Sequence, residues 1–316
     1  MLDAVLPLVL AIGAFYLVAA VVTLQLVADL VRFRRGQSLV GQFRGSPRWA
    51  GWARGVVITL AVGGLACAAD ALWVEPFWIQ VTQTHVVSPP SARPTSALRI
   101  VHLSDLHSET PVRVETALVQ EIRDLDPDLI AFTGDALNSP EGLSQFRVTM
   151  TDLARVAPTF AVLGNWDVWY WRDLDLYADT GVRLLDGDSE ILQLRGVRVW
   201  IGGASVDDPG GIERALDEVP PGALTVFLHH YPERVESARA RRVDLVLAGD
   251  THGGQVRIPG VGPLIEMQRF GTYYDQGLHR VGDTYLYVNR GLGMEGGSAP
   301  RVRFLCRPEV ALIEIH

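Results

Sequence analysis

Carboxylate, imidazole and amide side chains stand directly after short apolar runs along this sequence from residue 98 onward. Each run has the length of a buried strand, so each polar residue falls where a strand should give way to a loop. Asp, Asn and His supply the oxygen and nitrogen ligands that hard and borderline divalent metals prefer. The candidate metal ligands are Asp105, His107, Asp135, Asn165, His230, Asp250 and His252.

The densest of these clusters is Gly249-Asp250-Thr251-His252-Gly253-Gly254, which follows the apolar run Leu245 to Leu247. One such cluster is weak evidence, because an Asp after a strand is more commonly a turn former or a helix cap. Several clusters in one domain favour a shared site, since two metals that share a carboxylate need about seven ligands.

The elements that must position these residues are short apolar strands interleaved with amphipathic helices, a pattern that predicts a layered α/β domain. The expected strands are 98–103, 129–133, 159–163, 197–201, 224–228, 245–248, 285–288 and 310–315. The expected helices are 112–125, 143–156, 211–218 and 232–241.

The ordered motifs Asp-x-His, Gly-Asp, Gly-Asn-x-Asp, His and Gly-x-x-His-Gly-Gly resemble those of the calcineurin-like metallophosphoesterase superfamily. The Thr-His-Gly-Gly-Gln sequence and the later segment Asn289 to Gly293 resemble its bacterial membrane-tethered branch. The resemblance implies two mixed β-sheets packed as a sandwich flanked by helices, with a dinuclear metal site at the strand ends.

The resemblance also implies roles for single residues. One metal would be held by Asp105, His107 and His252, and Asp135 would bridge to a second. That second metal would be held by Asn165, His230 and the residue at position 250. His230 is chosen over His229 because the family ligand stands two residues before a proline, here Pro232. The implied cofactors are two divalent ions, drawn from Mn, Fe, Zn and Mg, and the implied catalytic residues are Asp105, Asp135, Asn165, Trp166 and Asp167.

Two positions depart from the family pattern. The family has His where this chain has Asp250, and a carboxylate there favours Mn²⁺, Fe or Mg²⁺ over zinc. The family also has a phosphate-contacting His where this chain has Trp166, whose indole donates one hydrogen bond but shuttles no proton. The aromatic group Trp166 to Trp171 fits either ordinary packing or an apolar wall for a lipid or aromatic substituent.

The function that the resemblance implies is hydrolysis of a phosphodiester, phosphomonoester or phosphoanhydride by a metal-activated water, without a covalent enzyme intermediate. The substrate would be a phosphorylated small molecule or lipid. The alternative is a metal-binding pseudoenzyme that acts as an envelope binding or scaffold protein, and Asp250 and Trp166 are the residues that favour it.

The N-terminal region has the composition of a membrane anchor over residues 1–79, with transmembrane helices expected at about 5–27 and 56–74. Six Arg residues and no acidic residue lie from Arg32 to Arg54. The positive-inside rule therefore predicts that this loop is cytoplasmic. The catalytic domain would then lie on the outer side, periplasmic or extracellular. The alternatives are a buried core helix or signal for the first segment, and a re-entrant hairpin that leaves the large domain inside.

Residues 80–97 contain Pro89, Pro90 and Pro94 among Ser and Thr, which predicts an extended linker before a catalytic domain at 98–316. The chain has 316 residues and a formal charge of −8, with no basic cluster in the part after the linker. An acidic chain of this kind argues against nucleic acid as its main partner.

Overall fold

The computed structural model describes residues 48–217, 219–264, 274–296 and 301–316. The chain divides into two units, residues 1–70 and Ala71–His316. Helix α2 (Arg48–Trp73) is the described part of the first unit and continues into the second. The segment Ile58–Phe77 is long and apolar enough to cross a membrane, judged by length and composition alone. It covers most of the expected span 56–74, whereas the expected span 5–27 lies outside the described residues.

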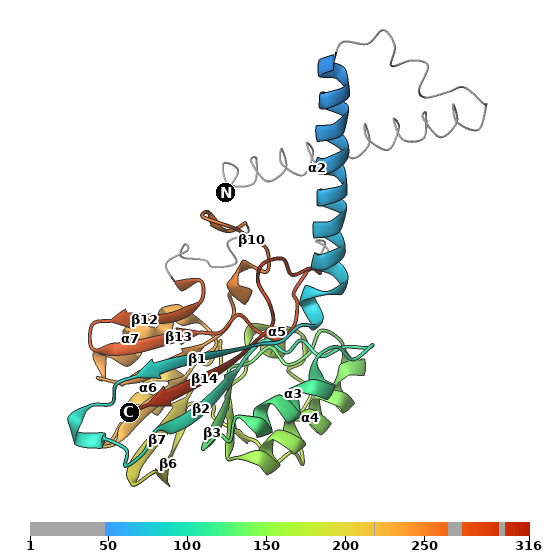
Figure 1. The fold of residues 1–316 in the computed structure, drawn as a ribbon. Helices are drawn as coiled ribbons and strands as arrows, with labels where there is room; N and C mark the ends of the chain where they lie inside the picture. The colour runs from blue at the N-terminus through green and yellow to red at the C-terminus, as the bar shows by residue number, and fades with distance from the viewer. Residues whose placement is uncertain (1–47, 218, 265–273, 297–300) are drawn as a thin grey trace. The chain divides into compact units, whose positions relative to one another are not determined.

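The second unit is built on two six-stranded mixed sheets (Figure 1). The first has the order β1-β14-β2-β3-β4-β5, and the second has the order β12-β13-β9-β8-β7-β6. In the first, β2 to β5 are parallel, and β14 runs antiparallel to β2 and parallel to β1. In the second, β7, β8, β9 and β13 are parallel, and the edge strands β6 and β12 run antiparallel. These mixed sheets confirm the expected α/β class.

The first sheet consists of β1 (Gln80–Val86), β14 (Glu309–Ile315), β2 (Leu98–Leu103), β3 (Leu129–Phe132), β4 (Thr159–Ala161) and β5 (Arg183–Leu184). The second sheet consists of β12 (Gly277–Val281), β13 (Thr284–Val288), β9 (Leu245–Ala248), β8 (Leu224–Leu228), β7 (Val197–Gly203) and β6 (Asp188–Leu194). A separate hairpin pairs β10 (Arg257–Ile258) with β11 (Gly262–Pro263). The remaining α-helices are α3 (Glu115–Asp124), α4 (Leu143–Val156), α5 (Asn165–Tyr170), α6 (Gly211–Asp217) and α7 (Val235–Ala240).

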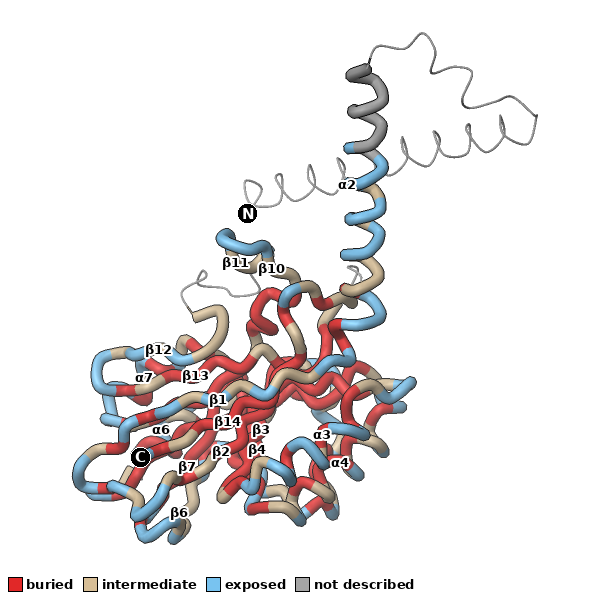
Figure 2. The backbone as a smooth tube through the Cα atoms, in the orientation of Figure 1, coloured by how far each residue is buried: buried red, intermediate tan, exposed pale blue. Residues whose placement is uncertain are grey.

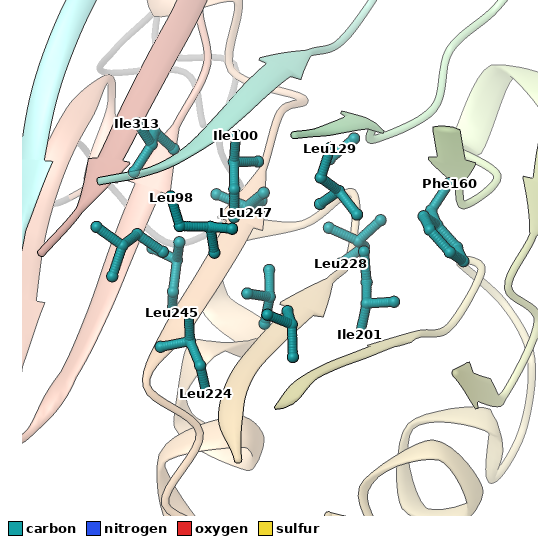
Figure 3. Close-up of a cluster of buried hydrophobic side chains, with 14 of the residues drawn as sticks. Leu98, Ile100, Leu129, Phe160, Ile201, Leu224, Leu228, Leu245, Leu247 and Ile313 are labelled. Carbon is teal, nitrogen blue, oxygen red and sulfur yellow. The ribbon is translucent and has the colours of Figure 1, made fainter. Parts of the chain in front are cut away.

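Three layers of buried apolar side chains hold the helices and sheets together. One cluster lies between the sheets, where Leu98 and Ile100 of β2 pack with Leu245 and Leu247 of β9 (Figure 3). The alternate residues of β2, such as Val101, face a second cluster that α3 and α4 cover, and a third cluster joins the other face of the second sheet to α6 and α7. Strands with apolar side chains on both faces read as continuous apolar runs, which is why their positions could be predicted. Figure 2 shows this buried interior and the exposed outer surfaces of the helices.

Residues 80–97 differ from the expected extended linker in their first half. Strand β1 pairs in register with β14, from Gln80 beside Glu309 to Val86 beside Ile315. Its residues alternate between partly buried and exposed, as an edge strand with one solvated face requires. The polar composition of Gln80 to His85 concealed this strand, because half of its side chains face water.

Candidate metal centre

The structure brings the seven candidate ligands to one end of the two sheets. Asp105 and His107 follow β2, Asp135 follows β3, and Asn165 begins α5 after β4. The other three follow strands of the second sheet, because β8 leads to His230 and β9 leads to Asp250 and His252. Six of these residues are buried, and Asp250 keeps 20% of its side chain exposed.

The first group of donors comprises Asp105, His107 and His252. Nε2 of His107 lies 3.2 Å from Nε2 of His252, and Nε2 of His252 lies 3.5 Å from Oδ1 of Asp105. Two imidazole nitrogens that each bind one ion at about 2.0–2.1 Å have a separation close to this. The group therefore has the dimensions of a metal site that draws ligands from both sheets.

The second group comprises Asp105, Asp135 and His230. Nε2 of His230 lies 3.5 Å from Oδ2 of Asp135 and 3.5 Å from Oδ1 of Asp250. Nδ1 of His230 donates to the carbonyl oxygen of Thr133 at 2.6 Å, which leaves Nε2 directed at the carboxylates as the ring atom available to a metal ion. Oδ2 of Asp135 is also 3.6 Å from Nε2 of His107, which places this carboxylate between the two groups.

Several buried side-chain oxygen and nitrogen atoms of the centre have no hydrogen-bond partner among the described residues. They include Oδ2 of Asp105, Oδ1 of Asn165 and Nε2 of His230, and the Nδ1 atoms of His107 and His252 are also without a partner. Buried polar atoms in folded proteins almost always have partners, and an unpaired one costs roughly 1–3 kcal/mol. Two divalent cations would supply partners for the Asp105, Asn165 and His230 atoms, so these residues fit a dinuclear centre.

Burial and neighbouring carboxylates shift the pKa values of several groups in the centre. Burial raises the pKa of Asp105 to about 8, and it lowers the pKa of His107 to about 4. Burial alone would also lower the pKa of His230, but Asp135, Asp250 and Asp105 around it raise that pKa well above its usual value. Buried carboxylates of this density need positive charge nearby, and divalent cations are its usual source in such sites.

Five of the candidate ligands have a backbone conformation that non-glycine residues rarely adopt. The φ angles are 50° at Asp105, 45° at His107, 58° at Asp135, 70° at Asp250 and 49° at His252. Each such residue costs on the order of 1–3 kcal/mol and persists only where the surroundings hold it, as they do at functional sites. The sharp turns direct consecutive side chains of one strand end toward the same point.

Two glycines allow the loops of the centre to approach each other closely. A Cβ atom on Gly164 would lie 2.1 Å from Oδ1 of Asp135, and one on Gly249 would lie 1.9 Å from Oγ of Ser104. Both distances are far shorter than any tolerated contact, so a larger residue at either position would displace the first-sheet carboxylates.

Asp167 and Trp166 connect the loops after β3 and β4. The Asp167 carboxylate accepts hydrogen bonds from the backbone N–H groups of Asp135, Ala136 and Gly164, at 2.8, 2.8 and 2.9 Å. The backbone N–H of Trp166 donates to Oδ1 of Asp135 at 2.9 Å. The Trp166 ring meets the His107 ring edge to face, with centroids 5.1 Å apart, so this side chain lies beside the first group of donors.

Glu295 is a residue of the centre that sequence reasoning missed. Its Oε2 lies 4.0 Å from Nε2 of His252, which places this carboxylate beside the first group of donors. The Gln255 side chain holds the Glu295 backbone by both its N–H and its carbonyl, at 2.9 and 2.7 Å. Gln255 belonged to a recognised motif, but nothing in the sequence indicates a partner 40 residues later.

The segment Asn289 to Gly293 supports the end of β2. The backbone N–H of Gly293 donates to the carbonyl of Asp105 at 2.6 Å, and the buried Arg303 guanidinium donates to the carbonyls of Arg290, Gly291 and Gly293. Arg290 itself donates to Glu309 rather than facing the donors. This segment is therefore structural support for Asp105.

Comparisons with known proteins agree with these motifs. Residues 98–254 match the family model described as calcineurin-like phosphoesterase. The chain is 28% identical over 278 residues to an uncharacterized metallophosphoesterase, YkuE, of Bacillus subtilis, covering 83% of this chain and 95% of that protein. It is 28% identical over 258 residues to the phosphodiesterase YaeI of Escherichia coli, covering 77% and 90%. It is also 28% identical over 266 residues to a transmembrane protein with metallophosphoesterase domain of Bos taurus, covering 76% and 57%.

Proposed function

Because this chain belongs to the calcineurin-like metallophosphoesterases and is a metal-dependent phosphoester hydrolase, we propose that it cleaves a phosphodiester, phosphomonoester or phosphoanhydride at a centre of two divalent ions. The observation that carries this proposal is the pair of buried donor groups that share Asp105. When bound, two divalent ions lower the pKa of water to make the nucleophile and neutralise charge on the phosphoryl oxygens.

We assign the ligands as the family resemblance implies. Asp105, His107 and His252 would hold one ion. Asp105 is common to both donor groups, and Oδ2 of Asp135 lies at nearly equal distances from His107 and His230, so Asp135 would also be shared. Asn165 and His230 would hold the second ion together with Asp250. The unpartnered Oδ1 of Asn165 and the 3.5 Å approach of Asp250 to His230 support this second set.

Asp167 and Trp166 position the ligands rather than react with the substrate. The described contacts of the Asp167 carboxylate are all with backbone N–H groups, so it keeps the loop of Asp135 beside that of Gly164. Trp166 contributes its backbone N–H to Asp135, and its ring packs edge to face against the ring of His107.

The proposed location is the cell membrane, with several spans and the catalytic domain on the outer side. Support comes from the apolar segment Ile58–Phe77, from the six Arg residues from Arg32 to Arg54 that precede it, and from the description of the Bos taurus relative as a transmembrane protein. Protease added to spheroplasts should remove the catalytic domain, and protection of that domain until the spheroplasts are lysed would refute the outward orientation.

The proposed activity is tested with the full chain in nanodiscs, by metal analysis and by turnover of bis-p-nitrophenyl phosphate under Mn, Fe, Zn and Mg. We expect bound metal near two ions per chain, and a loss of at least about 10²-fold in turnover for Asp135→Asn, since metal-centred charge stabilisation is worth several kcal/mol. Asp283→Asn, at a fully exposed turn, is the matched control. Two bound ions without turnover of any phosphoester would instead favour the binding or scaffold alternative.

A further inference from the structure

The β10–β11 hairpin ends in an uncharged apolar tip, from Ile258 to Leu264. Three of its side chains are exposed, with relative exposures of 42% at Ile258, 76% at Val261 and 44% at Leu264. Loop tips in water are rich in polar turn formers, and large exposed apolar groups that lie together mark an interaction surface. Figure 2 shows the hairpin projecting from the buried body of the domain.

A second group of exposed apolar side chains lies where the apolar helix enters the domain. It comprises Trp73, Val74, Phe77 and Trp78, which are 70%, 49%, 49% and 57% exposed. Tryptophan is enriched where a protein crosses the boundary between membrane and water, because its ring is apolar and its N–H is polar. This group includes the end of the candidate span Ile58–Phe77.

The segment from Arg303 to Cys306 ties the two groups together. The backbone N–H of Arg303 donates to the carbonyl of Ala71, and the Glu75 carboxylate accepts from the N–H groups of Leu305 and Cys306. On the hairpin side, Phe304 pairs with the base of the hairpin, since its N–H donates to Gln255 and its carbonyl accepts from Arg257, both at 2.9 Å.

The same segment also exposes an apolar side chain, because Leu305 is 50% exposed. We define the membrane-docking surface by the exposed apolar residues of these three parts: Trp73, Val74, Phe77, Trp78, Ile258, Val261, Leu264 and Leu305.

We propose that this membrane-docking surface enters the interfacial layer of the lipid bilayer, with the hairpin tip as a second membrane contact beside the anchor. The occupant is lipid because the surface is continuous in the chain with the apolar segment Ile58–Phe77 and its hairpin tip carries no charge. A helix terminus and a loop that both present Trp or aliphatic side chains fix an orientation that a single flexible anchor would not.

The hairpin is built onto the metal centre, so docking has a consequence for the substrate. The short 3₁₀ helix η6 (His252–Gly254) carries the candidate ligand His252 and directly precedes Gln255. Arg257 donates to the carbonyl of Gly253 at 2.8 Å, and Cys306 Sγ donates to the carbonyl of His252 at 3.2 Å. Docking therefore holds the centre next to the bilayer surface, and the substrate class that it favours is a phosphoester carried by an amphiphile in the same bilayer. This substrate class rests on the proposed function.

The docking is tested by fluorescence of the full chain in phosphatidylethanolamine–phosphatidylglycerol vesicles. In a Cys67→Ser background, Val261→Cys is labelled with an environment-sensitive dye, while the buried Cys306 stays unlabelled. Ile191→Cys is the matched control, because Ile191 is 49% exposed on the edge strand β6. We expect a blue shift at position 261 and a loss of emission with nitroxide-labelled lipids, and neither change at position 191.

Two results would overturn the docking. One is equal quenching of both positions by aqueous iodide, which means that the tip is in water. The other is protection of position 261 from iodide without quenching by nitroxide lipids, which means that protein, such as a second copy of the chain, covers the tip.

The substrate class is tested with Val261→Asp beside Ile191→Asp. We expect Val261→Asp to lower turnover of vesicle-embedded hexadecyl p-nitrophenyl phosphate relative to soluble bis-p-nitrophenyl phosphate, and Ile191→Asp to leave that ratio unchanged. An unchanged ratio in both variants would refute the lipid substrate alone. Failure of the unsubstituted chain on both substrates would refute the proposed hydrolase, while the fluorescence result would stand independently.

Discussion

The two sheets support the metal centre in different ways. The strand ends of the first sheet are bonded to one another, because the Asp167 carboxylate accepts hydrogen bonds from three backbone N–H groups in the loops after β3 and β4. The strand ends of the second sheet are joined by a backbone bond from the N–H of Gly249 to the carbonyl of His230 at 3.0 Å, and they also bond to the first sheet. Nδ1 of His230 pairs with the Thr133 carbonyl, and the backbone N–H of Asp250 donates to Oδ1 of Asp105 at 3.2 Å. The first sheet therefore forms a template on which the second sheet is aligned.

This difference explains where the chain departs from the family pattern. Trp166 follows a strand of the first sheet. Its contact with Asp135 comes from its backbone N–H, which any residue except proline supplies. Asp250 follows a strand of the second sheet, and among the candidate ligands its side chain alone keeps appreciable exposure to solvent. Trp166 therefore keeps the backbone contact with Asp135, whereas Asp250 places a different ligand type where the centre meets solvent.

The largest effect that would test this comparison is expected from Asp167→Ala. The change leaves three N–H groups without their carboxylate, and hydrogen bonds to charged groups are worth about 1.5–3 kcal/mol each. We expect a loss of roughly 3–5 kcal/mol in the free energy of unfolding, allowing for non-additivity, measured by denaturant titration in detergent. Turnover should fall by about 10²-fold, because small displacements of positioned groups have effects of that size.

The control for that variant is Asp173→Ala, at an exposed position just beyond α5. It should change neither the free energy of unfolding nor turnover. If Asp167→Ala unfolds as the unsubstituted chain does, the first sheet is not the rigid template, and the loops after β3 and β4 are held by other contacts.

The sequence predicted the strands and ligands whose positions are visible in the local order of apolar and polar residues. Strands buried on both faces, such as β8, are continuous apolar runs, so their ends and the ligands after them could be placed. Edge strand β1 was missed because its exposed face is polar. Glu295 and Arg303 were missed for a different reason, since their roles arise from partners brought close only by folding.

A smaller effect, on metal affinity, is expected from Asp250→Asn at the end of a second-sheet strand. The amide keeps the size of the side chain but removes the charge that lies 3.5 Å from Nε2 of His230. We expect affinity for one of the two ions to fall by on the order of 10–100-fold, as for changes that weaken rather than remove support for a metal site. The free energy of unfolding should change little, because Asp250 is partly exposed. Metal titration with a competing chelator measures the affinity, and denaturant titration measures the stability.

Asp250→His separates the effect of charge from the effect of ligation at this position. Imidazole is a softer donor than carboxylate, so the variant should keep both ions while its preference shifts from Mn²⁺ toward zinc. Direct competition between Mn²⁺ and Zn²⁺ in the two proteins measures that shift. If Asp250→Asn and Asp250→His both bind metal as the unsubstituted chain does, the residue at position 250 is not a ligand. The second ion would then be bound by Asn165, His230 and the shared carboxylates alone. Of these ligands, only His230 comes from the second sheet.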